Sequence, residues 1–364
     1  TAALFPGSIE LLRNLGAWET AREASEPISA IRIVDDRGAL LRPPEVLFSA
    51  ADAGCDVFGW NVPNGVLVEA LRAAARNPAT DVDMVETTAV TGLDIGENSV
   101  RISLAGGGDL EAALVVGADG RRSLCREAVG IATKAWTYPQ SALTCAFDHD
   151  RPHNGISTEF HRLGGPFTLV PLRGRASSLV WVERPEEAAR LAALETSAFR
   201  SAVEERLQGL LGSVGGIGPR AVFPLSGLET ASFAANRVAL VGEAAHVMPP
   251  IGAQGLNLGL TDAAVLADTL DAARRAARDV GGSETLSAYS KARRLDAGSR
   301  MAVVDLLNRS LLTGLLPVHL ARGLGLHILK AVGPLRRAVV REGLRPSLAR
   351  PSLMQPDGAR ESSP

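Results

Sequence analysis

The sequence predicts an α/β protein of two interleaved domains with helices at its C-terminal end. Its 364 residues exceed one ordinary domain and suggest two. Two short apolar runs, 112–118 and 238–241, each lead into a glycine-containing turn and then a helix-like pattern, as buried strands of a parallel sheet do. Hydrophobic residues make up 46% and charged residues 21%, a composition that excludes disorder for most of the chain.

The remaining elements follow from periodicity and turn residues. We expect helices over 8–15, 65–76, 186–194, 198–211 and 254–280. We expect strands over 28–34, 99–104, 110–116, 167–172, 177–183 and 237–241. The pattern changes between about Trp136 and Gly227, which predicts a second, mixed layer there.

Composition and missing motifs exclude several classes of protein. A net charge of -2 gives no general reason to bind nucleic acid. Three cysteines, with no C-x-x-C, argue against a disulfide scaffold or a zinc ribbon, and we predict no metal site. No Gly-Lys dipeptide, H-E-x-x-H or G-x-S-x-G occurs, which excludes the P-loop, zinc-protease and α/β-hydrolase interpretations. No uninterrupted apolar run is long enough for an ordinary spanning helix.

The strongest motif is the string from Arg237 to Gly259. It reads as a strand, a tight turn with the carboxylate Glu243, a Pro-Pro elbow, a glycine-rich loop and a helix start. Glycines let the backbone approach a flat ligand, and a helix start offers unpaired N–H groups to an anion. The alternative is a plain turn before a core helix, whose apolar stripe would be Leu256, Leu260, Ala263, Ala267 and Leu270.

A second motif runs from Val115 to Arg126. Asp119 and Gly120 follow a buried strand and precede a helix, the place where α/β sheets bind ligands. Arg126 can reach a phosphate or pair with Asp119. The alternative is a structural Asp-Gly turn with a capping carboxylate, and the string alone does not separate the two.

Together these strings resemble the flavoprotein aromatic hydroxylases, the class that includes para-hydroxybenzoate hydroxylase. The string from Val115 to Arg126 matches D-G-x-x-S-x-x-R. The string from Arg237 to Gly259 matches G-D-A-A-H-x-x-P-P-x-G-x-Q/K-G-x-N, with Glu243 in place of the aspartate. Segments 5–16 and 59–64 and the Gln254 variant favour the ubiquinone-biosynthesis branch. The resemblance implies FAD as cofactor, NAD(P)H as co-substrate, and these cofactor-binding residues: Asp119, Gly120, Arg126, Gly242, Glu243, Pro250, Gly252, Gln254, Gly255, Leu256 and Asn257.

The resemblance also implies the domain organisation. A Rossmann-like FAD-binding domain would comprise 1–26, 60–135 and 228–310, and an α+β substrate domain 27–59 and 136–227. C-terminal helices would cover 311–346, and a disordered tail 347–364. The family begins with a strand, a G-x-G-x-x-G turn and a helix that hold the FAD pyrophosphate. We expect the chain to lack this first βαβ unit, that is, to be truncated at its N-terminus, because the near match at Gly216–Ala221 lacks the strand–turn–helix order.

The implied activity is hydroxylation of an aromatic ring through a flavin C4a-hydroperoxide, with NAD(P)H and O₂. The substrate would be an aromatic small molecule, such as a polyprenylated phenol or quinol. Phe160, Phe167, Trp181 and Phe223 could contact it or could be plain core. We name no catalytic base. Two alternatives stay open: a related flavin reductase or halogenase, and a remnant without flavin that binds a membrane or a partner.

The C-terminal part bears on location. Residues 320–350 hold seven basic side chains and one acid, interleaved with leucines. This composition is compatible with a cytoplasmic protein bound peripherally to the anionic inner face of a membrane. The alternative is a solvated helix face docked on the flavin domain.

Overall fold

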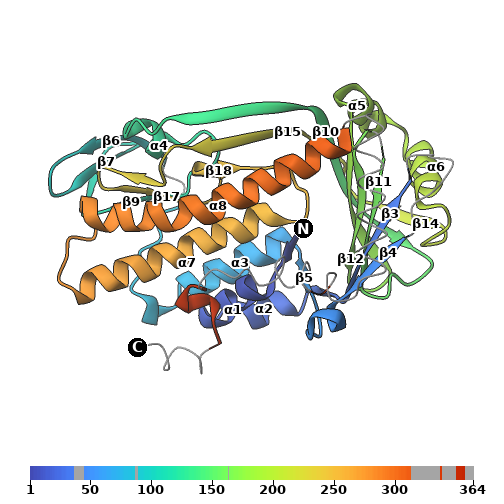
Figure 1. Ribbon diagram of the computed structural model, residues 1–364, viewed down its shortest axis with the longest axis horizontal. Coiled ribbons are helices and arrows are strands. Elements are labelled where there is room, and N and C mark those ends of the chain that lie inside the picture. The colour runs from blue at the N-terminus through green and yellow to red at the C-terminus, as the bar shows by residue number, and fades with distance from the viewer. Residues whose placement is uncertain (37–44, 87–88, 163, 313–336, 338–349, 357–364) are drawn as a thin grey trace.

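The computed structural model describes residues 1–36, 45–86, 89–162, 164–312, 337 and 350–356. Figure 1 shows a helical part with small sheets on one side and a large sheet with two helices on the other. Two long strands, β10 (Thr133–His149) and β15 (Ala221–Thr230), run between the two parts and pair with each other. The predicted α/β class is confirmed.

The large sheet has nine strands among the described residues, in the order β18-β15-β10-β13-β12-β11-β3-β4 with β14 beside β10. All its pairings are antiparallel except β11 with β3. Helices α5 (Pro185–Ala193) and α6 (Thr196–Leu207) pack on one face. The remaining strands are β3 (Ala30–Asp35), β4 (Val46–Ser49), β11 (Ile156–His161), β12 (Pro166–Leu172), β13 (Ala176–Glu183), β14 (Val214–Ile217) and β18 (His246–Val247).

The two faces of this sheet bury different side chains. Along β10, Leu143, Cys145 and Phe147 enter the core under α5 and α6. Phe160, Phe167 and Trp181 join the same core, where Phe167 meets Trp181 edge-on with 5.1 Å between ring centroids. Strand alternation places Ala142 on the opposite face. Phe223 lies opposite Ala142 in the register, so it shares that face, and it is 55% exposed.

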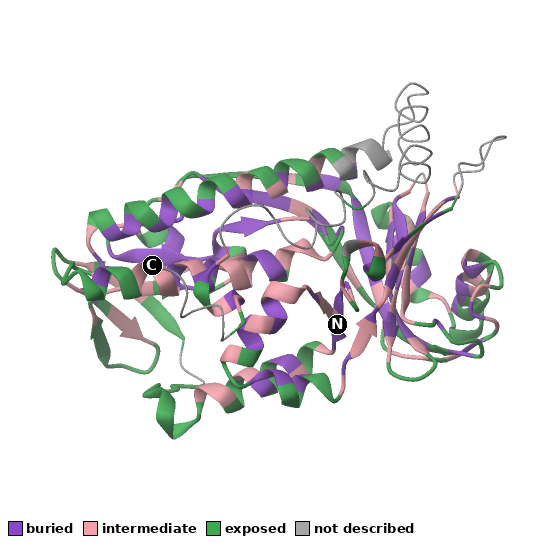
Figure 2. Ribbon diagram, turned by 60° about the horizontal axis from the view of Figure 1, so that its bottom comes forward, coloured by how far each residue is buried: buried purple, intermediate pink, exposed green. Residues whose placement is uncertain are grey.

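The helical part contains the parallel pair that the sequence predicts. Strand β9 (Val115–Gly117) runs parallel to β17 (Val238–Leu240), which also pairs with β16 (Ala234–Ala235). Helices α7 (Gln254–Arg275) and α8 (Ser283–Leu312) pack with this sheet. Figure 2 shows buried and exposed faces alternating along both helices. The predicted helix over 254–280 ends at Arg275 because Ala277 adopts a left-handed φ of 52°.

Smaller elements complete the helical part. The N-terminal sheet is β1 (Ala2–Leu4), β5 (Gly59–Val62) and β2 (Glu26–Ile28), packed with α1 (Pro6–Asn14), α2 (Trp18–Arg22) and α3 (Asn64–Ala75). A meander holds β6 (Val90–Ile95), β7 (Val100–Leu104) and β8 (Asp109–Ala112). Short helical turns are η1 (Ala50–Ala53), η2 (Pro78–Thr80), η3 (Gly242–Ala244) and η4 (Ser352–Met354), and α4 spans Leu124–Ala128.

The described residues include only part of the segments for which we predict C-terminal helices and a disordered tail. Beyond Leu312, the predicted helices over 311–346 lie outside the described residues apart from residue 337, as do 347–349 and 357–364 of the predicted tail. Residues 350–356 differ from the prediction of disorder. Met354 is buried against α1 and α7, and Asn14 donates a hydrogen bond to the carbonyl of Leu353. Apolar burial by Met354 therefore orders this part of the tail.

We predict that two aromatic substitutions in the large sheet lower the free energy of unfolding by very different amounts. Trp181→Ala should lower the free energy of unfolding by about 3–5 kcal/mol, because it empties a packed core. Phe223→Ala should change it by less than about 0.5 kcal/mol, because the ring is exposed. Urea unfolding followed by circular dichroism measures both. Equal losses in the two variants would contradict the assignment of the two faces.

Candidate cofactor site

The two sequence motifs meet at one end of the parallel pair. Gly117 lies opposite Leu240 in the register, and the N–H of Val241 donates to the carbonyl of Gly117 at 3.0 Å. The turns that carry Asp119 and Glu243 therefore leave the sheet side by side. The carboxyl ends of parallel strands are where open α/β sheets bind ligands.

Asp119 is held by the helix start that follows it. Its Oδ2 accepts the N–H of Cys125 at 3.0 Å, and Ser123 caps α4 by accepting the N–H of Arg126. Burial alone would raise the pKa of Asp119, but hydrogen bonds from Cys125 and Ser123 outweigh it, so this pKa lies below its ordinary value. Gly120 has a φ of 77°, and a Cβ there would meet open space. This turn therefore presents a fixed negative charge beside accessible backbone.

Arg126 connects the two motifs. It is buried, and its guanidinium donates to the carbonyls of Ala244 at 2.8 Å and Arg121 at 2.9 Å. The sequence predicts a phosphate contact or an ion pair with Asp119 for this residue. In the structure the guanidinium instead fastens the turn after β17 to the turn after β9.

The turn after β17 depends on glycine at two places. Gly242 has a left-handed φ of 61°, which Cβ-bearing residues rarely adopt. A Cβ on Gly259 of α7 would lie 3.1 Å from the Cα of Gly242, so the helix can approach the turn only without a side chain there. Glu243, next along the turn, is exposed. Its carboxylate is thus placed at the end of a tightly packed turn.

The first turn of α7 is open toward a ligand. Ala253 precedes it with a left-handed φ of 53°, and no side chain caps the helix. Pro250, Gly252 and Leu256 are exposed, and Gly255 is half-buried. A helix start has N–H groups without intrahelical partners and a partial positive charge. In Figure 1 this end of α7 is the end nearest the large sheet.

The side chain of Asn257 is turned inward. Its Oδ1 accepts the N–H of Phe5 and the hydroxyl of Ser8, both at 2.8 Å. Its Nδ2 donates to the carbonyls of Ala3 at 2.8 Å and Ala253 at 2.7 Å. Only the backbone of Asn257 is therefore left for a cofactor, and the side chain fixes the helix start to the N-terminal segment.

Sequence reasoning missed a buried charge network behind this site. Asp262 is fully buried and accepts from the N–H of Gly242 at 2.9 Å, while His246 Nε2 lies 2.6 Å from the same oxygen. Arg293 of α8 donates to the other oxygen at 2.6 Å and to Asp296 at 2.7 Å. A signal exists in the sequence: Asp262 stands at the helical spacing of four residues between the apolar Leu258 and Leu266, so a charged side chain falls on the face that both leucines bury.

The network continues to the loop before α7. Arg300 donates from Nε to Asp296 at 2.8 Å and from a terminal nitrogen to Gln254 Oε1 at 3.2 Å. Burial would raise the pKa of Asp296, but hydrogen bonds from Arg300 and Arg293 hold it below the ordinary value. Gln254 is therefore oriented by a charged pair on α8.

These features fit FAD. The turns at Gly120 and Gly242 leave backbone open to close approach, Glu243 offers an exposed acceptor for a hydroxyl, and the uncapped start of α7 suits the electron-rich edge of a ring. Flavin binding by the predicted site residues stays a prediction.

Comparisons with known proteins point to the same cofactor. A family described as FAD binding domain matches residues 2–303. The ubiquinone hydroxylase UbiL of Rhodospirillum rubrum is 37% identical over 335 residues, 92% of this chain and 76% of that protein. The 3-demethoxyubiquinol 3-hydroxylase of Escherichia coli is 28% identical over 345 residues, 94% of this chain and 86% of that protein.

Solved structures share the fold. The p-nitrophenol 4-monooxygenase of Pseudomonas putida superimposes with a TM-score of 0.75 at 19% identity, covering 96% of this chain and 89% of that one. HpxO of Klebsiella pneumoniae, solved with FAD and uric acid, gives a TM-score of 0.73 at 16% identity, covering 96% and 88%.

We predict that Asn257→Ala lowers the free energy of unfolding by about 2–3 kcal/mol, because it leaves several polar groups of the N-terminal segment without partners. Leu256→Ala, at the exposed neighbour, is the matched control and should change it by less than about 0.5 kcal/mol. Urea denaturation measures both, and an Asn257→Ala protein as stable as the control would refute the structural role.

We also predict that Cys125 is inert in the native protein. Burial, together with the negative charge of Asp119, raises its pKa to about 12. The unfolded thiol titrates near 8.5. Stability from the buried thiol is therefore complete below that value and is lost as the pH rises toward 12, because the unfolded state releases its proton first. A disulfide reagent at pH 8 should label half-exposed Cys55 and spare Cys125, and fast native labelling of Cys125 would contradict this.

Proposed function

The chain belongs to the FAD binding domain family of flavin-dependent monooxygenases, and on that premise we propose that it hydroxylates the aromatic ring of a quinone precursor. FAD, when bound, supplies the oxygen activation, with NAD(P)H as the reductant. The single observation that carries the proposal is the meeting of both motif turns with the open first turn of α7.

Each part of this site has a role toward the cofactor. Glu243 would accept a hydrogen bond from the ribityl chain, since its carboxylate is exposed at the end of the turn. The N–H groups of Gly255 and Leu256 would stabilise negative charge on the ring edge. Arg126 and Asn257 act as positioning residues, because their side chains bind protein groups instead of facing the ligand.

The substrate would bind on the face of the large sheet that α5 and α6 leave uncovered. Phe223 is exposed there, opposite Ala142, which packs with Val182. An apolar surface of this kind holds an aromatic ring and excludes water, which protects a reactive oxygen donor from side reactions. Phe160, Phe167 and Trp181 belong to the other face and take no part.

The names of two relatives, a ubiquinone hydroxylase and a 3-demethoxyubiquinol 3-hydroxylase, support a polyprenylated phenol or quinol as the substrate. The surface of α8 supports delivery from a membrane. Leu295 and Leu306 are 71% and 69% exposed, and their spacing of eleven residues places them about 20° apart around the helix. No helix in the described part of the chain is long and apolar enough to cross a bilayer.

A decisive experiment is to reconstitute the chain with FAD and supply NADPH, a short-chain polyprenyl phenol and ¹⁸O₂. We expect NADPH oxidation that depends on the phenol, and a product that carries one labelled oxygen. NADPH oxidation without labelled product would favour the reductase alternative, and a brominated product in the presence of bromide would favour the halogenase. A folded chain with no flavin absorption would favour the remnant.

Glu243→Ala tests the cofactor contact. We expect the dissociation constant for FAD to rise about tenfold or more, because a charge-assisted hydrogen bond is lost. The thermal midpoint of the cofactor-free protein should stay unchanged, because Glu243 is exposed. Glu205→Ala, at an exposed position of α6, is the control. Unchanged FAD affinity would remove Glu243 from the site.

A further inference from the structure

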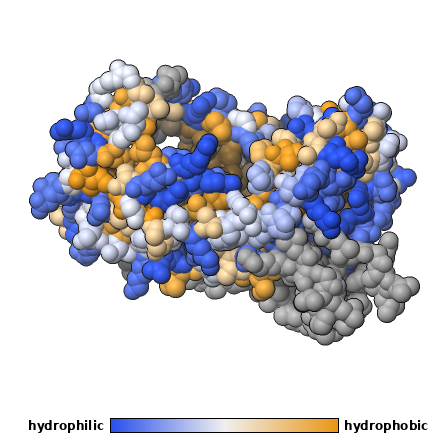
Figure 3. Space-filling view, turned by 90° about the horizontal axis from the view of Figure 1, so that it is seen from above, coloured by the Kyte–Doolittle hydropathy of each residue, from blue (hydrophilic) through white to orange (hydrophobic). Residues whose placement is uncertain are grey.

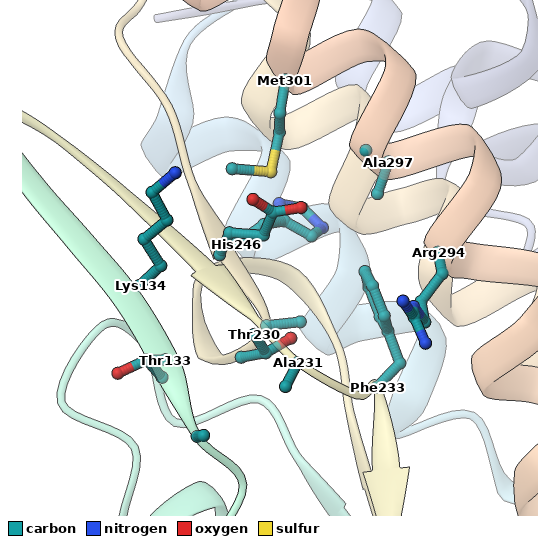
Figure 4. Close-up of a pocket in the computed structure, with 13 residues that line it drawn as sticks. Thr133, Lys134, Thr230, Ala231, Phe233, His246, Arg294, Ala297 and Met301 are labelled. Atoms are coloured by element: carbon teal, nitrogen blue, oxygen red, sulfur yellow. The ribbon is translucent and has the colours of Figure 1, made fainter.

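A cavity lies behind the turn that carries Glu243, where Ala245 and His246 form part of its wall. It has a volume of about 410 Å³ and is enclosed by the β10–β15 ribbon, β18 and the middle of α8. Figure 3 views the molecule from above and shows a hollow with hydrophobic walls bordered by strongly hydrophilic atoms. Figure 4 shows the lining side chains converging from these elements. None of the predicted cofactor-binding residues, Asp119 and Glu243 included, is among its lining residues, so it is a separate space from the candidate cofactor site.

One buried polar group in this lining lacks a partner. Thr230 is only 5% exposed, and its Oγ1 has no hydrogen-bond partner in the structure. A buried hydroxyl without a partner costs free energy. A rotation about its Cα–Cβ bond exchanges the methyl and the hydroxyl, which lets the hydroxyl meet a bound molecule.

His246 supplies a second polar group. It lines the cavity, and its Nε2 is already taken by Asp262 at 2.6 Å. Nδ1 is therefore the ring nitrogen left for a ligand. Because the hydrogen bond with Asp262 and a tilted contact with the Phe233 ring, 5.9 Å between ring centroids, hold the imidazole, its orientation is set in advance.

The charges at the mouth leave one cation in excess. Lys134 and Glu229 lie opposite each other in the β10–β15 register, so their charges compensate. Arg294 of α8 also lines the cavity, and its side chain forms no ion pair with the described residues. The mouth thus carries one uncompensated positive charge.

Phe233, Ala297 and Met301 form an apolar part of the cavity wall. The volume lies in the range of small-molecule sites. We propose that this cavity binds a small organic anion with an apolar body, of the arylalkanoic acid class. Its carboxylate is held by Arg294, its body lies against Phe233 and Met301, and Thr230 and His246 fix its orientation. This site does not depend on the proposed hydroxylase activity.

The probe is 3-phenylpropanoate, with the neutral 3-phenylpropanamide as its matched control, titrated into the 364-residue chain by calorimetry. We expect the acid to bind and the amide to bind about tenfold more weakly. Arg294→Gln should raise the dissociation constant of the acid about tenfold. Lys291→Gln, on the same helix outside the cavity, should leave its affinity unchanged.

Gly298→Leu fills the cavity from α8. A Cβ at this position first meets a Glu229 oxygen at 3.9 Å, an ordinary contact, and leucine favours the helix, so the variant should fold. It should abolish binding of the acid. The proposal is overturned if the chain does not bind the acid, if Gly298→Leu binds it unchanged, or if the amide binds as tightly as the acid. Binding that persists in Gly298→Leu would place the probe on the face of the large sheet that carries Phe223 instead.

Discussion

The candidate site depends on one buried carboxylate. Asp262 is fully buried, and a buried charge is tolerated only when it is paired and hydrogen-bonded. Its partners come from three elements: the N–H of Gly242 after β17, His246 in β18 and Arg293 in α8. Because Asp262 itself is on α7, this single group fixes the helix, the turn and the neighbouring strand relative to one another.

The placement of the ligand-facing backbone follows from that constraint. The hydrogen bond to Gly242 sets the left-handed turn that carries Glu243, and Gly259 permits the close approach this bond requires. Through Arg293, Asp296 and Arg300, the same network reaches Gln254 at the start of α7. The links among Arg293, Asp296 and Arg300 are ionic, and the last link is a hydrogen bond from Arg300 to the neutral Gln254. The site is thereby held without side chains that would compete with the cofactor for its open N–H groups.

Local sequence patterns predict the framework well and side-chain partners poorly. The strand–turn–helix order of both motifs follows from an apolar run, a glycine and a helical period, all of which lie within about ten residues of one another. Arg126 reaches Ala244, 118 residues away, and Asn257 reaches Phe5 and Ser8, 249 or more residues away, so no local pattern gives these contacts. Strand alternation and register place Phe223 and Trp181 on opposite faces, but only the packing of the core shows which face α5 and α6 cover. The burial of Met354 in the tail is likewise a long-range contact.

This division between buried side chains and exposed backbone explains why glutamate can stand where the family's motif has aspartate. The inward-facing groups, Arg126, Asn257 and Asp262, have their partners at fixed distances, and a change of length would break those contacts. Glu243 is exposed, and the turn that carries it is fixed by Gly242 and Ala244 through their backbone atoms alone. An extra methylene therefore disturbs no packing. It lengthens the reach of the carboxylate and adds one rotatable bond. Fixing that bond when the cofactor binds costs conformational entropy, which is a fraction of the whole side-chain entropy of glutamate.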